Sequence, residues 1–211
     1  MKPTVCPAIL ANDAHEFRAQ MESASRYAVR LHIDVSDGVF APTKTVPVDQ
    51  IWWPGGVRAD LHVMYKRPFD HLRGMLALQP QMIIVHAEAE GDFEMFARRA
   101  HERGIQTGVA LLPGTAPELL AQAIKDIDHV LIFSGDLGRY GGKADLDLLQ
   151  KVQVLKQLKP QLEIGWDGGV NDENAKALAQ GGIEVLNVGG YINHADDPQT
   201  AYNRLRVLLD S

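Results

Sequence analysis

The chain has 211 residues, a formal net charge of −6 and 45% hydrophobic residues, which suits one globular domain spanning residues 1–211. The negative charge argues against a nucleic-acid binder, which needs a basic face, and no apolar run approaches the roughly 20 residues that cross a bilayer. The single cysteine, Cys6, excludes an intrachain disulfide. A cytoplasmic location is predicted from this single cysteine and from the lack of a signal-peptide pattern at the start.

Strand-like and helix-like segments alternate along the chain. Short β-rich runs predict strands at 5–10, 29–35, 57–64, 82–85, 107–112, 129–133, 162–166 and 185–188. Helical periodicity and caps predict helices from the cap at 12–16 to about 27, at 68–78, 92–103, 115–125, 145–158, 171–180 and 198–209, and a short one within 42–56. The helix at 115–125 is predicted from a capping box formed by Thr115 and Glu118.

Eight strands alternating with eight helices predict right-handed βαβ units and a parallel sheet. This pattern favours a closed (β/α)8 TIM barrel, near the lower limit of length for that fold. A doubly wound open sheet is the structural alternative. Its glycine-rich dinucleotide signature is missing after the first strand, where the chain reads Ala11-Asn12-Asp13.

Polar residues close three of the predicted strands. His32 and Asp34 share one face of the second strand, His62 ends the third, and Asp167 ends the seventh. In a barrel the C-terminal strand ends converge, so these side chains would form a four-ligand metal site. Two histidines and two carboxylates suit Zn²⁺, Mn²⁺, Fe²⁺ or Co²⁺ better than Ca²⁺. Each residue alone is more simply a structural strand-end group, but their joint placement favours a metal.

Other polar positions have less specific interpretations. His86 ends the fourth strand, where it either orients a metal ligand from outside or is a hydrogen-bonded core histidine. Asp37, before Gly38, is expected to order a turn.

Three glycine pairs follow the last three predicted strands. In a barrel, the loops after strands seven and eight often bind phosphate through backbone N–H groups. Arg139 and Lys143 in the sixth loop either add charge there or lie on the solvated surface. The candidate phosphate-binding residues are Gly141, Gly142, Gly168, Gly169, Gly189 and Gly190.

These motifs together resemble the ribulose-phosphate 3-epimerase family over nearly the whole chain. The His-x-Asp-x-x-Asp-Gly and Asp-Gly-Gly-Val elements are the most specific part of the match. The matching segments are Cys6-Pro7-Ala8-Ile9-Leu10, His32-Ile33-Asp34-Val35-Ser36-Asp37-Gly38, Leu61-His62-Val63-Met64, Pro113-Gly114-Thr115, Gly141-Gly142 and Asp167-Gly168-Gly169-Val170.

The resemblance implies an isomerase, a phosphate-binding TIM barrel with one divalent metal (Zn, Fe, Mn or Co) held by His32, Asp34, His62 and Asp167. It implies a small sugar-phosphate substrate, a homo-oligomer, and no nucleic acid or membrane partner. Asp34 and Asp167 would act as the two acid/base groups that move the proton at C3 of a ketose phosphate. The metal would stabilise the enediolate as charge develops.

The chain also departs from the family pattern around the implied pocket. Ala8 and Ser36 stand where the family usually has Ser and Met, and Met64 is the remaining pocket residue that the motifs imply. Phe133 replaces a Met, Leu112 a polar residue, and the sixth loop, residues 134–143, lacks the usual Asn-Pro-Gly-Phe.

The sequence is therefore consistent with three functions. The first is a metal-dependent 3-epimerase converting D-ribulose 5-phosphate to D-xylulose 5-phosphate. The second is an epimerase of another sugar phosphate, favoured by the changed pocket. The third is a catalytically silent barrel that binds a phosphate metabolite, against which the intact pair Asp34 and Asp167 argues.

Overall fold

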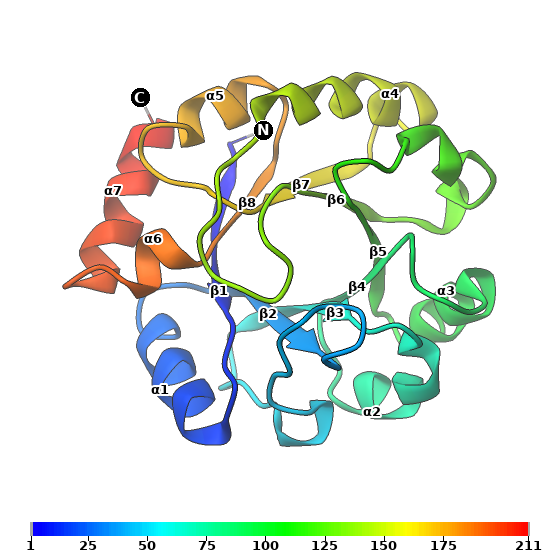
Figure 1. The fold of residues 1–211 in the computed structure, drawn as a ribbon, viewed down its shortest axis with the longest axis horizontal. Coiled ribbons are helices and arrows are strands. Elements are labelled where there is room, and N and C mark those ends of the chain that lie inside the picture. Colours follow the sequence, from blue (N-terminus) through cyan, green and yellow to red (C-terminus); the bar gives the residue numbers. More distant parts are fainter. Residues whose placement is uncertain (1, 211) are drawn as a thin grey trace.

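In the computed structural model, which describes residues 2–210, eight parallel strands close into a barrel in which β8 pairs with β1. Each strand pairs with its sequence neighbours (Figure 1). This confirms the (β/α)8 barrel and excludes the open sheet. The strands are β1 (Thr4–Ile9), β2 (Arg30–Ser36), β3 (Arg58–Met64), β4 (Met82–His86), β5 (Gln106–Leu111), β6 (His129–Phe133), β7 (Glu163–Asp167) and β8 (Val185–Val188).

Helices form a ring around the barrel (Figure 1). The α-helices are α1 (Ala14–Ala24), α2 (Leu72–Ala77), α3 (Phe93–His101), α4 (Gln150–Leu158), α5 (Ala175–Gln180), α6 (Gly190–Asn193) and α7 (Pro198–Asp210). Short 3-10 helices lie at η1 (Val48–Gln50), η2 (Pro68–His71), η3 (Pro117–Gln122), η4 (Ile124–Asp126) and η5 (Leu146–Leu149).

The predicted α-helix at 115–125 is wrong, because the segment forms the 3-10 helices η3 and η4. The capping box fails since the Thr115 hydroxyl donates to the Glu88 carboxylate instead of capping the helix. Ala116 stands at the N-cap of η3 and offers no side-chain acceptor. By contrast, the predicted cap before α1 is confirmed: Asp13 accepts hydrogen bonds from the backbone N–H groups of His15 and Glu16, both at 2.9 Å.

The main hydrophobic core lies between the outer face of the barrel and the helices. Its fully buried side chains include Phe17 and Met21 of α1, Phe96 of α3, and Leu205 of α7. Helices that bury such residues at i and i+4 against a sheet gain most of their stability from this packing. A second, small apolar cluster contains Met82, Ile84, Ala110 and Leu131.

Charged residues are buried at the N-terminal ends of the strands, where they form an ion-pair network. The Arg30 guanidinium donates to Asp60 at 2.7 Å and, through two nitrogens, to both carboxylate oxygens of Glu163 at 2.9 Å. His129 Nδ1 lies 2.8 Å from the same Glu163 carboxylate. A Cβ at Gly165 would lie 2.6 Å from His129 Nε2, so the imidazole occupies space that only a glycine leaves open.

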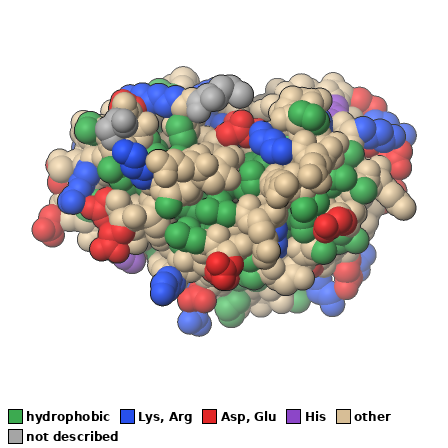
Figure 2. All heavy atoms as spheres, turned by 90° about the horizontal axis from the view of Figure 1, so that it is seen from above, with side chains coloured by type: hydrophobic (Ala, Val, Ile, Leu, Met, Phe, Trp, Pro, Cys, Tyr) green, Lys and Arg blue, Asp and Glu red, His purple; other side chains and the backbone are tan. Residues whose placement is uncertain are grey.

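No helix within residues 2–210 is long and apolar enough to cross a bilayer. Figure 2 shows one face of the molecule, where hydrophobic side chains gather near the centre. Acidic and basic side chains are interspersed around them. This face therefore carries no continuous basic surface of the kind that binds nucleic acid.

Candidate metal centre and active site

The four predicted ligands converge at the C-terminal ends of β2, β3 and β7. One ligand atom from each of His32, Asp34, His62 and Asp167 lies within 4.8 Å of the other three. His62 Nδ1 is 2.8 Å from Asp34 and 3.6 Å from Asp167. His32 Nε2 is 3.3 Å from Asp34 and 3.7 Å from Asp167. The convergence expected from the sequence is confirmed.

Strand register explains this meeting of distant residues. Asp34 of β2 and His62 of β3 are paired across the parallel ladder, so their side chains point to the same side of the sheet. His32 lies two residues earlier on β2 and therefore projects on the same side as Asp34. Asp167 is the last residue of β7 and reaches the pair across the barrel mouth.

The two carboxylates have opposite pKa shifts. Burial alone would raise the pKa of Asp34, but the His32 imidazole, 3.3 Å away, and the hydrogen-bond contact with His62 outweigh it and lower the pKa below its usual range. Burial and the neighbouring Asp34 charge raise the pKa of Asp167 to about 6. A carboxylate pair whose pKa values are pushed apart is typical of sites that pair a base with an acid.

The four residues fit a divalent cation. His32 is fully buried, and among the described residues neither of its ring nitrogens has a hydrogen-bond partner. An unpaired buried imidazole nitrogen beside two carboxylates is costly unless a cation binds between them. Two imidazoles and two carboxylates are a donor set of intermediate softness, which suits Zn²⁺, Fe²⁺, Mn²⁺ or Co²⁺.

His86 contacts the cluster from outside. Its Nε2 lies 2.9 Å from His62 Nε2, so this buried histidine is hydrogen-bonded to one of the four cluster residues. The ring packs against Phe40, with 4.7 Å between centroids. Burial lowers the pKa of His86 to about 4, which keeps the imidazole neutral near pH 7.

A cavity of about 270 Å³ opens above the cluster. Asp34 and Asp167 lie on its lining, but Ser36 does not. Ala8 and Met64 contribute to its wall, as the family resemblance implied, and so does Arg139. All six glycines predicted for phosphate binding also line it: Gly141, Gly142, Gly168, Gly169, Gly189 and Gly190.

Two of these glycines are required by close backbone approach. Gly168 and Gly169 have φ of 109° and 68°, which favours glycine. A Cβ at Gly168 would lie 2.1 Å from the Gly135 nitrogen, and one at Gly169 would lie 2.2 Å from the Ala144 nitrogen. The loop after β7 therefore packs backbone to backbone against the β6–α4 loop (residues 134–145).

The β6–α4 loop crosses the mouth of the barrel in front of the strands (Figure 1). Its Tyr140 was not among the predicted site residues. The Tyr140 hydroxyl accepts from the Leu10 N–H at 2.6 Å and lies 2.6 Å from Gln20 Oε1 and 3.1 Å from the Ala8 carbonyl. This one hydroxyl joins the loop to the end of β1 and to α1.

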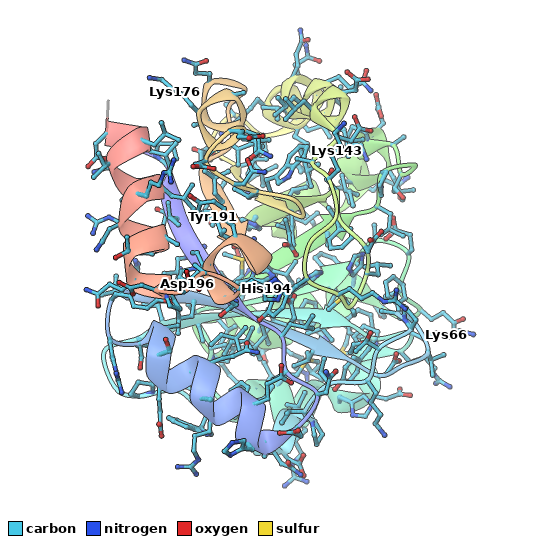
Figure 3. The ribbon with its side chains drawn as sticks, turned by 60° about the vertical axis from the view of Figure 1, so that its left-hand side comes forward. Lys66, Lys143, Lys176, Tyr191, His194 and Asp196 are labelled. Atoms are coloured by element: carbon cyan, nitrogen blue, oxygen red, sulfur yellow. The ribbon has the colours of Figure 1, made fainter. Side chains whose placement is uncertain are left out.

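Two further cavity residues, Asn187 and His194, were missed by the sequence interpretation. Asn187 is buried beside Asp167 in register, and among the described residues its amide has no hydrogen-bond partner. The signal that was available is a polar residue within the apolar strand β8. His194 follows α6 and packs edge-on against the Tyr140 ring, with centroids 5.7 Å apart. In Figure 3, His194 and Tyr191 lie at α6, across from Lys143 on the β6–α4 loop.

Fold and site together define the class of protein: a (β/α)8 barrel with a centre of two histidines and two carboxylates at the C-terminal ends of its strands. Solved structures with this fold include a ligand complex of KGPDC from Streptococcus mutans (TM-score 0.74, 13% identity, covering 100% of this chain and 98% of that one). Another is 3-hexulose-6-phosphate synthase from Salmonella typhimurium (TM-score 0.72, 18% identity, 99% and 98% covered).

Sequence comparison gives the particular family. The model of the ribulose-phosphate 3 epimerase family matches residues 4–193. A ribulose-phosphate 3-epimerase of Helicobacter pylori is 31% identical over 215 residues, covering 98% of each chain. One from Bacillus subtilis is 27% identical over 211 residues, covering 96% of this chain and 97% of the relative. The chain belongs to the ribulose-phosphate 3 epimerase family and is an epimerase, an enzyme of the isomerase class.

Proposed function

We propose that this protein interconverts D-ribulose 5-phosphate and D-xylulose 5-phosphate by epimerisation at C3, with one divalent cation at the four-residue cluster. The observation that carries the proposal is the buried pair Asp34 and Asp167 at the floor of the cavity, with pKa values shifted in opposite directions. The substrate class is supported by the relatives, which are ribulose-phosphate 3-epimerases.

The two carboxylates supply the base and the acid. Epimerisation removes the proton on C3, which is acidified by the neighbouring carbonyl, and returns a proton to the opposite face. The ionised Asp34 carboxylate removes the proton in one direction, while the protonated Asp167 carboxyl delivers one from the other side. The forward reaction therefore leaves Asp34 protonated and Asp167 ionised. In the reverse reaction the roles are exchanged, and Asp167 removes the proton while Asp34 delivers one.

The cation would be held by His32 Nε2, His62 Nδ1, Asp34 and Asp167, whose ligand atoms face one another. When bound, it supplies positive charge where negative charge develops on the oxygens next to C3. The surrounding chain fixes the ligands, since both histidines are fully buried on adjacent strands.

The substrate phosphate would bind at the glycine-lined end of the cavity. Backbone N–H groups there have no side chain in the way and hold an anion without a full opposing charge. The pocket wall beside Ala8, Met64 and Phe133 is apolar and excludes water from the reacting carbon. The proposal also includes one domain over residues 1–211, from the chain length, and a cytoplasmic location, from the single cysteine and the N-terminal sequence. It includes a homo-oligomer, from the family resemblance.

The direct test is the fate of the C3 proton. Purified protein loaded with Mn²⁺ or Zn²⁺ is incubated with D-ribulose 5-phosphate in D₂O and followed by NMR. We expect D-xylulose 5-phosphate with deuterium at C3. Unchanged substrate under every metal tested would contradict the proposal.

A second candidate is an epimerase of a different ketose phosphate. It is favoured by Tyr140 of the changed sixth loop, which lines the cavity and bonds through its hydroxyl to the end of β1. The same exchange assay with four-, five- and six-carbon 2-keto sugar phosphates decides between them. If kcat/KM is at least about tenfold higher for a sugar phosphate of another chain length, that compound would replace ribulose 5-phosphate as the proposed substrate. Such a ratio corresponds to roughly 1.4 kcal/mol in transition-state stabilisation.

A further inference from the structure

A series of side-chain contacts leads from the metal cluster toward the end of β5. His62 Nδ1 faces Asp34 at 2.8 Å, and His62 Nε2 lies 2.9 Å from His86 Nε2. His86 Nδ1 lies 3.5 Å from the Glu88 carboxylate. His62, His86 and Glu88 therefore form one series of contacts, referred to below as the His62–His86–Glu88 chain.

Glu88 is firmly held at the far end of this chain. Its Oε1 accepts a hydrogen bond from the Leu112 N–H at 3.2 Å and another from the Thr115 hydroxyl. The buried Lys151 ammonium donates to the carbonyls of Leu112 and Thr115, at 2.7 and 2.9 Å, which places a positive charge in the same loop. Burial alone would raise the pKa of Glu88, but the nearby His86 imidazole and the hydrogen bonds from Thr115 and the backbone lower it to about 2.

The geometry of the chain favours one arrangement of protons. The Glu88 carboxylate accepts from Leu112 and Thr115, so it faces His86 as an acceptor and favours a proton on His86 Nδ1. His86 Nε2 is then a lone pair, and the proton between the two rings belongs to His62 Nε2. His62 Nδ1, at 2.8 Å from Asp34, is left as the nitrogen that can bind a cation.

A cation bound to His62 Nδ1 rules out the opposite direction of protons. If His62 carried its proton on Nδ1, His86 would have to donate from Nε2 and turn a lone pair toward the Glu88 carboxylate. Two acceptors facing each other in a buried site are unfavourable. The lone pair of His62 beside Asp34 is equally unfavourable without a cation, and it becomes a ligand when a cation lies between them. The chain thus prepares His62 for metal.

We propose that Glu88 is a positioning residue that, through His86, holds His62 in the tautomer whose Nδ1 binds the metal. The inference rests on the proposed metal site and deepens it. Groups that hydrogen-bond to a metal-bound histidine from behind fix its ring orientation and raise its basicity, and their loss typically weakens metal binding about 10- to 100-fold.

The test compares two glutamine variants two residues apart. Glu88→Gln keeps the shape of the side chain but lets it donate toward His86 Nδ1. Glu90→Gln is the matched control, because Glu90 is exposed and pairs at 3.3 Å with Lys66, which lies at the edge of the molecule in Figure 3. Zn²⁺ affinity is measured by chelator competition. We expect about 10- to 100-fold weaker binding in Glu88→Gln and wild-type binding in Glu90→Gln.

Nitrogen NMR of histidine-labelled protein gives a readout that a purely structural role would not move. In the wild type with Zn²⁺, we expect the proton of His62 on Nε2 and that of His86 on Nδ1. In Glu88→Gln, we expect the His86 proton to shift to Nε2 in the metal-free protein. Thr115→Val removes one anchor of Glu88 and should weaken Zn²⁺ binding only a few-fold; Glu88→Ala is used if the glutamine variant does not fold.

The outcomes separate this inference from the proposed function. Wild-type protein that binds Zn²⁺ and epimerises, together with a Glu88→Gln variant of unchanged affinity and unchanged histidine tautomers, would overturn the role of Glu88 alone. Wild-type protein that binds no divalent cation would overturn the metal site, and the inference with it.

Discussion

The two ends of the barrel interior use buried charge in opposite ways. At the N-terminal ends of the strands, Arg30 pairs with both Asp60 and Glu163 through hydrogen bonds of 2.7 to 2.9 Å. At the C-terminal ends, Asp34 and Asp167 face two histidines, and neither carboxylate is paired with a lysine or arginine by any contact of the described residues. One end holds its carboxylates against an arginine, and the other leaves its carboxylates for a cation.

This difference shows which buried charges serve stability and which serve chemistry. A network of paired, oppositely charged side chains rigidifies the barrel, and removing one partner leaves a buried ion without its partner. A cluster of like charges costs stability and is retained where a ligand offsets that cost. Single substitutions can therefore change one end of the barrel and leave the other intact.

The largest effect is expected at the catalytic end. Asp34→Asn or Asp167→Asn removes one of the two groups that exchange the C3 proton, and each should lower kcat about 10²- to 10⁴-fold. Because the pKa of Asp167 is raised by burial and by the Asp34 charge, metal-free Asp167→Asn should be no less stable than the wild type near neutral pH. Steady-state kinetics and thermal unfolding check both parts; retained turnover with either variant would contradict the acid/base assignment.

The next effect belongs to the opposite end. Arg30→Met leaves Asp60 and Glu163 without their buried partner and should lower the free energy of unfolding by about 3–5 kcal/mol. Urea unfolding measures it. Arg58→Met, at the exposed residue paired with Arg30 in register, is the control and should change stability by less than about 0.5 kcal/mol. Equal losses in the two variants would contradict the role of the network.

The two ends should also respond to pH with opposite signs in metal-free protein. The pKa of Asp167 is raised from 3.8 to about 6 in the folded state, so its stabilising contribution is complete below pH 3.8 and lost as pH rises through 6. A two-unit shift corresponds to about 3 kcal/mol. In Asp167→Asn, the unfolding midpoint should therefore change less with pH between about pH 4 and 7.

Glu163 behaves in the reverse way. Burial alone would raise its pKa, but Arg30 and His129 lower it below its usual range, so its contribution is present above pH 4.5 and lost as pH falls through the folded value. In Glu163→Gln, the unfolding midpoint should become less dependent on pH only on the acid side. If both variants altered the pH dependence on the same side, the contrast between the two ends would be wrong.

The smallest effect concerns the cover of the cavity. Tyr140→Phe removes the hydroxyl that joins the β6–α4 loop to Leu10 and Gln20, at a cost of about 1 kcal/mol. We expect KM to rise a few-fold with little change in kcat, since the loop contributes to binding more than to the proton transfer. A drop in kcat with unchanged KM would place Tyr140 in the chemistry instead.

The sequence was sufficient for the barrel and for the four converging residues. The alternation of strands and helices has few topological solutions, and polar residues at strand ends meet at one face in a parallel barrel. His32, Asp34, His62 and Asp167 could therefore be predicted together, although they come from three strands far apart in the chain.

What the sequence did not reveal depends on contacts between distant segments. The Thr115 hydroxyl follows a regular capping pattern, yet it is used by Glu88, which is brought near only by the closure of β4 against β5. Tyr140 lies in a glycine-rich loop with no periodicity, so its contact with β1 could not be read from local pattern. Arg30 looks like a strand-edge residue until the barrel places Glu163 beside it.

Metal titration shows whether turnover depends on a cation at the four-residue cluster. Protein stripped with a strong chelator is titrated with Mn²⁺ or Zn²⁺ while the epimerisation of D-ribulose 5-phosphate is followed, with His62→Ala as the comparison. We expect turnover to be absent without metal, to rise to a plateau at one equivalent per chain, and not to be restored in His62→Ala at that ratio. Full turnover in the stripped protein, or equal restoration in His62→Ala, would contradict this dependence.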